Sequence, residues 1–401
     1  MSHIVEFSIS GLAGRKDVYS QVLDRHVNVF FGLNGSGKTS LLKILHSAMS
    51  GESRILRNVP FSSAEVKIYS ITYDRILTRT IDKQLAGAEK EAEPESEAGV
   101  SDVMSSVQEY FALTTAIREG VPETTRFPQW EEEPTIPDRT AGSLSHRYLP
   151  TSRLYLGLRT IESQIISSRL GVLSEEVLDR CFAETLKHLW ANYYSDVLTA
   201  VREAQEDGLA SILKAVLSGR KQPKTSVQEI DLKTAYNRVT RFLARQGSPG
   251  ILGSLEDFEK HYEENEQLRS VVNDIDEIER RIADATSPRD KLQSLIQEMF
   301  TGNKEVRFRD KSIDVITYDD ENIGLSTLSS GEKHVLRILI ESLLADSNSI
   351  LIDEPELSMH VDWQKNLIRT MRQLNSEAQF ILATHSPEIM ADLSDDRIFR
   401  L

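Results

Sequence analysis

A short glycine-rich turn between an apolar stretch and a helix constrains the fold of this 401-residue chain more than any other feature. Residues 27–31 read Val-Asn-Val-Phe-Phe, which is typical of a buried strand. The turn at residues 32–37 follows, and apolar residues after it recur at helical spacing (Leu41, Leu42, Ile44 and Leu45). The order strand, glycine turn and helix predicts an α/β fold with the turn at the end of a sheet strand.

The spacing of this turn matches a phosphate-binding loop. Gly32 and Gly37 are followed by Lys38 and Thr39, and residues without side chains let successive backbone N–H groups surround phosphate oxygens. In such a loop the lysine lies on the β- and γ-phosphates and the threonine hydroxyl reaches Mg²⁺. The alternative, a glycine turn that binds nothing, is disfavoured by the complete consensus. The predicted nucleotide-binding residues are Asn34, Gly35, Ser36, Gly37, Lys38, Thr39 and Ser40.

Composition restricts the class of protein. The formal charge of −15 argues against non-specific coating of nucleic acid, which requires clustered lysine and arginine. The single cysteine, Cys181, rules out an intramolecular disulfide and fits a reducing compartment. The N-terminus begins a strand, and no apolar run reaches the roughly 18 residues of a transmembrane helix. We therefore expect a cytoplasmic protein without a membrane partner.

Composition and periodicity divide the chain into three segments. Residues 1–153 are predicted to form a strand-rich N-terminal lobe with an acidic mobile loop at about 82–106. Residues 154–300 show helical periodicity, and strands resume in a C-terminal lobe at 301–401. Within the helical segment, apolar residues at three- and four-residue steps predict a short coiled-coil-like arm over 255–300, broken at Ser287-Pro288 before a returning helix.

The helical segment also holds the one concentration of basic residues in an acidic chain. An ordinary solvated helix face explains it most simply. The alternative is a surface that binds nucleic acid phosphates or an acidic partner. The basic residues, set against Glu229 and Asp231, are Lys214, Arg220, Lys221, Lys224, Lys233, Arg238, Arg241 and Arg245.

A second candidate anion-binding segment precedes the apolar helix at residues 335–344. Ser329 and Glu332 have the spacing of a capping box, which alone could explain this pair. It does not explain Gly331, because glycine has low helix propensity. A helix start that offers serine hydroxyls and a glycine N–H suits a γ-phosphate, so Ser329, Ser330 and Gly331 are predicted to bind nucleotide.

Two further apolar stretches end in polar residues. Residues 349–353 predict a buried strand that ends at Asp353 and Glu354, and the edge of an α/β sheet where such strands end presents catalytic groups. Asp353, with Thr39, is a candidate to hold Mg²⁺, and Glu354 is a candidate general base for an attacking water. Residues 380–384 predict a third strand, which places His385 where it can reach a γ-phosphate. Glu354, His385 and Lys38 are the predicted catalytic residues.

Taken together, these motifs resemble those of ATP-binding-cassette (ABC) ATPases. The loop Gly-Leu-Asn-Gly-Ser-Gly-Lys-Thr, the Leu-Ser-Ser-Gly-Glu signature, the Asp-Glu-Pro-Glu strand end and the Thr-His-Ser-Pro segment are most similar to the branch with RecF, SMC and OLD-family proteins. The motifs cover about the first and last 75 residues; between them, only Tyr-Leu-Pro-Thr-Ser-Arg (148–153) looks like an element of small prokaryotic ATPases. The resemblance also implies a magnesium-contacting glutamine, which Gln84, Gln108 and Gln129 do not securely supply.

The resemblance implies an ABC-type P-loop ATPase head, assembled from the N- and C-terminal segments, that uses ATP and Mg²⁺. It also implies a head-to-tail homodimer, or a higher homo-oligomer, in which the loop of one copy and the signature of the other enclose each ATP. The chain lacks the Ser-x-Leu-Asp pattern of transporter cassettes and a chromosome-length coiled coil, and we expect it to lack the nuclease domain of OLD proteins.

This combination is most similar to ATPase subunits of anti-phage systems such as Septu, PARIS and the retron-linked ATPases. We therefore expect nucleotide-driven dimerisation to control a separate effector, a nuclease. The alternative is a RecF-like DNA repair or replication ATPase whose helical insertion binds DNA or RNA.

Overall fold

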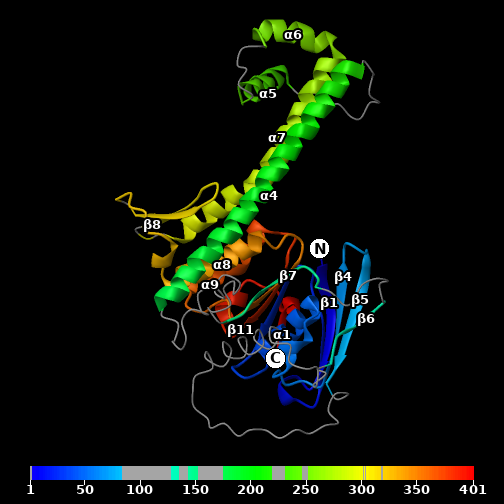
Figure 1. Cartoon of the computed structure of the whole chain (residues 1–401), viewed down its shortest axis with the longest axis vertical. Coiled ribbons are helices and arrows are strands. Elements are labelled where there is room, and N and C mark those ends of the chain that lie inside the picture. The colour runs from blue at the N-terminus through cyan, green and yellow to red at the C-terminus, as the bar shows by residue number, and fades with distance from the viewer. Residues whose placement is uncertain are drawn as a thin grey trace, which may run out of the picture. The chain divides into compact units, whose positions relative to one another are not determined.

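The computed structural model describes residues 2–83, 128–134, 143–151, 175–218, 231–245, 252–300, 302, 304–317 and 319–401. Two compact units are present. The first comprises residues 1–188, 295–307 and 313–401, and the second comprises residues 189–294 and 308–312. Figure 1 shows the elements of both units. The expected acidic loop at about 82–106 lies almost entirely outside the described residues.

The first unit is built on a five-stranded parallel sheet in the order β12-β3-β11-β10-β7. Its central strands β3, β10 and β11 are almost entirely buried and mostly apolar, as expected for strands covered on both faces. The register aligns the strand ends, since Phe31 pairs with Thr384 and Asp353 with Ala383. The strands are β3 (Val27–Phe31), β7 (His146–Leu149), β10 (Ser349–Asp353), β11 (Gln379–Thr384) and β12 (Ile398–Arg400).

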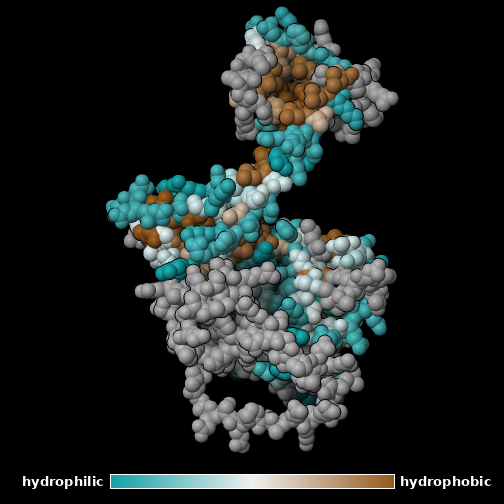
Figure 2. Space-filling view, viewed as in Figure 1, coloured by the Kyte–Doolittle hydropathy of each residue, from teal (hydrophilic) through white to brown (hydrophobic). Residues whose placement is uncertain are grey.

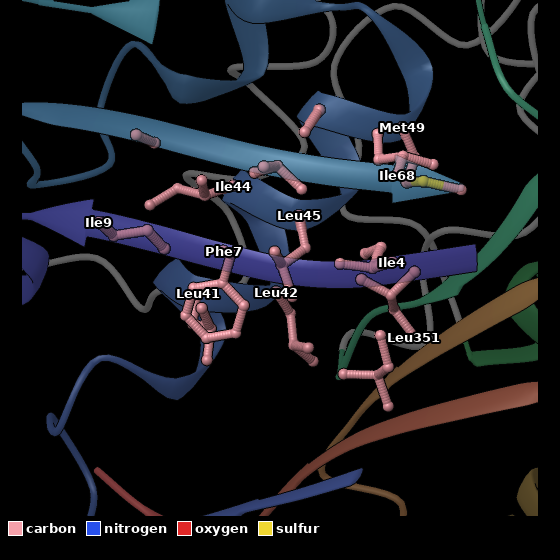
Figure 3. Packing of buried hydrophobic residues seen from close by; sticks show 14 of the residues in the cluster. Ile4, Phe7, Ile9, Leu41, Leu42, Ile44, Leu45, Met49, Ile68 and Leu351 are labelled. Atoms are coloured by element: carbon pink, nitrogen blue, oxygen red, sulfur yellow. The ribbon is translucent and has the colours of Figure 1, made fainter. Parts of the chain in front are cut away.

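An antiparallel sheet in the order β2-β1-β4-β5-β6 forms a second layer of this unit. Helix α1 (Lys38–Ser50) packs between the two sheets, and its apolar side chains meet β1 and β4 on one side and Leu351 on the other (Figure 3). This explains why the helix after the glycine turn is apolar over most of its circumference. The strands are β1 (Ser2–Ser10), β2 (Val18–Val22), β4 (Ser63–Ser70), β5 (Arg75–Asp82) and β6 (Glu131–Glu133).

Buried Arg79 links the C-terminal end of α1 to the antiparallel sheet. Its guanidinium donates to the carbonyl oxygens of Ala48 and Met49 in the last turn of α1 and pairs with Glu132 of β6. A cation at this position satisfies carbonyls that a helix C-terminus leaves unpaired. Trp130 adds a hydrogen bond from Nε1 to Ser47 Oγ at 2.8 Å. The far end of the phosphate-loop helix is therefore held on the sheet that covers it.

Helices α8 (Ser330–Leu343) and α9 (Val361–Leu374) pack against each other, and in Figure 1 they lie across the parallel strands from α1. Trp363 of α9 stacks on Phe300 and donates from Nε1 to the Met299 carbonyl at 3.1 Å.

Strands β8 (Lys304–Phe308) and β9 (Ile313–Thr317) form a hairpin. Short 3₁₀ turns complete the chain at Leu12–Gly14, Ser53–Leu56, Leu325–Thr327, Pro387–Met390 and Asp395–Arg397.

The second unit is helical. It contains most of α4 (Glu175–Ser218) and α7 (Glu266–Met299), with α5 (Leu232–Arg245) and α6 (Leu255–Glu264). The pairs Asp207–Arg281 and Ser211–Asp274 show that α4 and α7 run antiparallel, since the residue number rises in one helix as it falls in the other. A small core joins α5, α6 and α7, with Val239, Phe258 and Ile275 among its buried residues.

The predicted break at Ser287-Pro288 is wrong. Helix α7 continues through Pro288 to Met299, so the segment expected to return as a separate helix is the same helix. Apolar residues on both sides of the proline, such as Ile278 and Leu292, are buried, and their packing offsets the hydrogen bond that proline cannot make. The helical segment is interrupted instead at Asn265, whose backbone is extended and which lies between α6 and α7. The predicted boundary after residue 153 lies outside the described residues and stays a prediction.

Candidate nucleotide-binding site

The phosphate loop lies where β3 ends, as the sequence predicts. Lys38 is buried, and its Nζ donates to the carbonyl oxygens of Gly32 at 2.8 Å and Leu33 at 3.0 Å. An ammonium group has three donors, so one remains for an anion held in the loop. Asn34, Gly35 and Thr39 are exposed, while Ser36 and Ser40 are half-buried. The loop thus presents backbone and hydroxyl groups around one buried cation.

Gly37 is required at its position for two reasons. Its φ of 102° is a left-handed conformation that side chains disfavour, and a Cβ there would lie 2.9 Å from Ala13 Cβ. The segment around Ala13 therefore packs directly on the loop. Arg15, from the same segment, donates to the Ser36 carbonyl at 3.3 Å. These contacts fix the loop from the side of the antiparallel sheet.

Asp353 and two hydroxyl groups meet at the end of β10. Thr39 Oγ1 and Thr151 Oγ1 each donate to Asp353 Oδ2 at 2.8 Å, and Asp353 is 1% exposed. The other carboxylate oxygen, Oδ1, is buried and has no hydrogen-bond partner among the described residues. Burial raises the pKa of Asp353, and the bonds from Thr39 and Thr151 oppose that shift.

This donor set fits a magnesium ion. Mg²⁺ prefers hydroxyl and carboxylate oxygens, and it usually takes one or two protein ligands beside phosphate oxygens and water. The unpartnered Asp353 Oδ1 is a buried acceptor that a cation or its water would satisfy. Thr39 and Asp353 are therefore the residues that would hold the ion, as the sequence predicts.

Of the three glutamines considered above, only Gln129 is described, and it precedes β6 of the antiparallel sheet.

Glu354 has an unusual backbone conformation directly after Asp353. Its φ is 50°, which is uncommon for a residue with a long side chain, and its N–H donates to the Ala383 carbonyl at 2.8 Å. Strained residues of this kind cluster at functional sites because the surrounding structure holds them in place. Burial, followed by the negative charge of Asp353, raises the pKa of Glu354. A carboxylate with a raised pKa is a stronger base near neutral pH.

His385 lies beside this carboxylate at the end of β11. Its Nδ1 is 3.9 Å from Glu354 Oε1 and 3.0 Å from Glu356 Oε1. Glu356 is buried, and its Oε1 also accepts from the backbone N–H groups of His385 at 2.9 Å and Ser386 at 3.2 Å. Glu356 therefore anchors the loop that carries the histidine.

The Ser329 region begins α8 as predicted, and the glycine at position 331 has a structural role in packing. The capping box is formed: Ser329 N–H donates to Glu332 Oε2 at 2.6 Å, and Glu332 N–H donates to Ser329 Oγ at 3.3 Å. A Cβ on Gly331 would lie 2.3 Å from the Ser358 carbonyl oxygen, so glycine has a packing reason here. Ser329 and Ser330 are exposed and open to another molecule, whereas Gly331, also predicted to bind nucleotide, is buried.

The structure brings the predicted residues of β3, β10 and β11 to one sheet edge. Two residues in this group were not assigned a role from the sequence, Thr151 and Glu356. Both residues belong to motifs that the sequence showed: Thr151 lies in Tyr-Leu-Pro-Thr-Ser-Arg, and Glu356 is the last residue of Asp-Glu-Pro-Glu. Only the order of the strands in the sheet brings them to Asp353 and His385.

The basic segment is described in part. Arg238 pairs with Asp276 of α7, whereas Lys233 and Arg241 of α5 are exposed. Arg220, Lys221 and Lys224 lie outside the described residues, and the side chain of Arg245 is not described. The interpretation of this segment as a nucleic acid surface stays a prediction.

Two protein-family profiles match the chain. Residues 229–391 match a family described as an AAA domain, putative AbiEii toxin, Type IV TA system, and residues 9–139 match a second AAA domain family. Between them they include the predicted phosphate loop, the Ser329 region, Asp353 and His385. The chain is therefore similar to AAA-type ATPase domains over two separate segments.

Curated proteins similar to part of the chain include a retron probable ATPase and an endonuclease. The Retron Ec83 probable ATPase of Escherichia coli is 28% identical over 125 residues, which cover 27% of this chain and 23% of the relative. The endonuclease GajA of Bacillus cereus is 26% identical over 159 residues, which cover 34% of this chain and 28% of GajA. The chain therefore spans less than a third of the length of either relative.

Among solved structures, the chain has low similarity to SMC head domains. The head from Pyrococcus furiosus, with an extended coiled coil and bound to the C-terminal domain of ScpA, is 12% identical, with a TM-score of 0.40 over 98% of this chain and 92% of that one. The head from Thermotoga maritima is 10% identical, with a TM-score of 0.38 over 97% of this chain and 91% of that one.

Among the described residues, no helix combines the length and apolar character needed to cross a membrane.

Proposed function

We propose that this chain binds ATP with Mg²⁺ and hydrolyses it at a site shared between two copies. The observation that carries the proposal is the sheet edge where Lys38, Thr39, Asp353, Glu354 and His385 converge. A buried cation, a hydroxyl–carboxylate pair and an adjacent strained carboxylate are the groups that phosphoryl transfer to water requires.

Each group has one task in this proposal. Lys38 binds phosphate oxygens, and Thr39 with Asp353 holds Mg²⁺, which when bound neutralises phosphate charge. Glu354 accepts a proton from the attacking water, and His385 contacts the γ-phosphate. The exposed first turn of α8, with Ser330, completes the site of the neighbouring copy, because helix N-termini favour anions.

Phosphate release by the purified chain tests the enzymatic proposal. With ATP and Mg²⁺ we expect turnover at least about tenfold above that of Lys38→Met, because methionine keeps most of the length of the side chain and removes its charge. Wild-type turnover equal to that of Lys38→Met would reject hydrolysis. Bound ATP without turnover would identify a binding scaffold instead.

We further propose that the ATP-bound dimer controls a separate nuclease effector in a bacterial anti-phage system, in the cytoplasm. The support is the similarity to a retron ATPase and to GajA. Phage plating on cells that carry the gene with its neighbours tests this role. We expect Glu354→Gln to abolish protection, and equal plating on wild-type and variant cells would contradict it.

Glu356 gives a separate prediction about the loop that carries His385. Glu356→Ala removes the acceptor of the His385 N–H and one of two acceptors of the Ser386 N–H, which costs about 1–3 kcal/mol, or about 5- to 150-fold in kcat if His385 moves away. Glu356→Gln keeps an oxygen acceptor and should recover most of this loss. The KM for ATP should stay within about threefold, because Glu356 lies away from the phosphate loop's own hydrogen bonds.

A double-mutant cycle provides the control for Glu356. If Glu356 acts through His385, adding Glu356→Ala to His385→Ala should lower kcat no further. Fully additive losses would contradict this positioning role. Exposed Glu377→Ala, at the opposite end of β11, should leave kcat unchanged.

A further inference from the structure

Thr151 reaches the candidate magnesium site from the end of β7, a strand that was not predicted to contribute to the site. Strand β7 pairs in parallel with β10, and Leu149 is the register partner of Ile352. Pro150 and Thr151 therefore follow β7 at the level where Asp353 ends β10. The Thr151 hydroxyl donates to Asp353 Oδ2 at 2.8 Å, the same length as the bond from Thr39 to that oxygen.

The two carboxylate oxygens of Asp353 differ in their hydrogen bonds. Asp353 Oδ2 accepts from two hydroxyls contributed by separate parts of the chain, while Oδ1 is buried and has no partner in the part of the chain that the structure describes. If Thr151 served only to satisfy a buried carboxylate, a bond to Oδ1 would remove the unsatisfied atom, and leaving such an atom costs about 1–3 kcal/mol. The arrangement instead gathers oxygen atoms on one side of the carboxylate and leaves an acceptor free on the other.

Hydroxyl oxygens retain two lone pairs after donating a hydrogen bond, so both threonines still offer acceptor capacity at this point. Mg²⁺ binds such oxygens and keeps several waters, which themselves need protein acceptors. Groups around metal ligands orient them, and their loss typically costs about 10- to 100-fold in metal affinity.

We propose that Thr151 is part of the Mg²⁺ site and, together with Thr39, holds Asp353 and the water around the ion. This inference rests on the proposed ATP-binding function. It assigns to the end of β7 the third oxygen-bearing side chain of the site. Thr151 is a positioning residue here, because its observed contact is with Asp353.

Manganese binding tests the proposal without relying on turnover. Mn²⁺ substitutes for Mg²⁺ at oxygen sites, and the electron paramagnetic resonance signal of free Mn²⁺ reports how much is bound. The full-length chain is saturated with a non-hydrolysable ATP analogue and titrated with Mn²⁺. We expect Thr151→Val, which keeps the side-chain shape and loses the hydroxyl, to weaken Mn²⁺ binding by about tenfold or more. Thr151→Ser should stay within about threefold of wild type.

The controls separate this inference from the proposed function. Thr370→Val removes a buried hydroxyl that donates to the Asn366 carbonyl within α9, and it should leave Mn²⁺ affinity unchanged. Analogue affinity in EDTA should be the same for wild type and Thr151→Val, which also shows that the variant is folded. If Thr151→Val is unfolded, the Thr151→Ala variant is titrated in its place. Equal Mn²⁺ affinities of wild type and the hydroxyl-free variant would overturn the role of Thr151, whereas wild type that binds neither analogue nor Mn²⁺ would overturn the proposed function.

Discussion

Glu354→Gln is expected to bind ATP as well as wild type does and to hydrolyse it about 10²- to 10⁴-fold more slowly, because an amide cannot accept the proton of the attacking water. The substitution preserves shape, and the bond from the residue 354 N–H to the Ala383 carbonyl does not involve the side chain. Single-turnover hydrolysis at saturating ATP measures the chemical step, and size-exclusion chromatography with ATP should show an accumulated dimer.

The control for this variant is Glu377→Gln, an exposed acid in the loop before β11 and therefore at the other end of the parallel sheet. It should hydrolyse ATP at the wild-type rate. A hydrolysis rate for Glu354→Gln within about threefold of wild type would remove Glu354 as the base, and a loss of ATP binding would indicate a structural role instead.

Ser330→Glu is expected to abolish turnover without lowering stability. Position 330 is exposed in the first turn of α8, where an acidic side chain typically stabilises a helix by about 0.3–1 kcal/mol. The same carboxylate would repel a γ-phosphate brought to this turn by another copy. We expect kcat to fall at least about 100-fold while the melting temperature stays equal or rises.

Ser326→Glu, an exposed substitution in the preceding 3₁₀ turn, adds the same charge outside the helix start and should leave most of the activity. If Ser330→Glu hydrolyses ATP normally, the first turn of α8 does not contact the nucleotide. Equal losses in both variants would point to a general charge effect.

The sequence predicted the parts of this protein that local patterns specify. The strands at 27–31, 349–353 and 379–384 and the capping box at Ser329 formed because each depends on residues a few positions apart. Their meeting at one edge follows from the parallel order of the sheet, which the motifs implied through the resemblance.

The parts that escaped prediction depend on distant residues. Thr151 lies 202 positions from Asp353, and only the pairing of β7 with β10 joins them. The close approach of Gly331 to the Ser358 carbonyl is likewise a tertiary contact. Pro288 signals a helix end locally, but buried apolar residues on both sides keep α7 continuous.

The central claim is that each hydrolytic site contains the phosphate loop of one copy and the α8 start of another. Mixing Lys38→Met with Ser330→Glu, each inactive alone, tests it directly, because a mixed dimer regains one site with both elements intact. Phosphate release by the equimolar mixture should reach about a quarter of the wild-type rate, since half the dimers are mixed and each has one of two sites intact. A mixture that stays as inactive as its components, under conditions in which the subunits exchange, would contradict the claim.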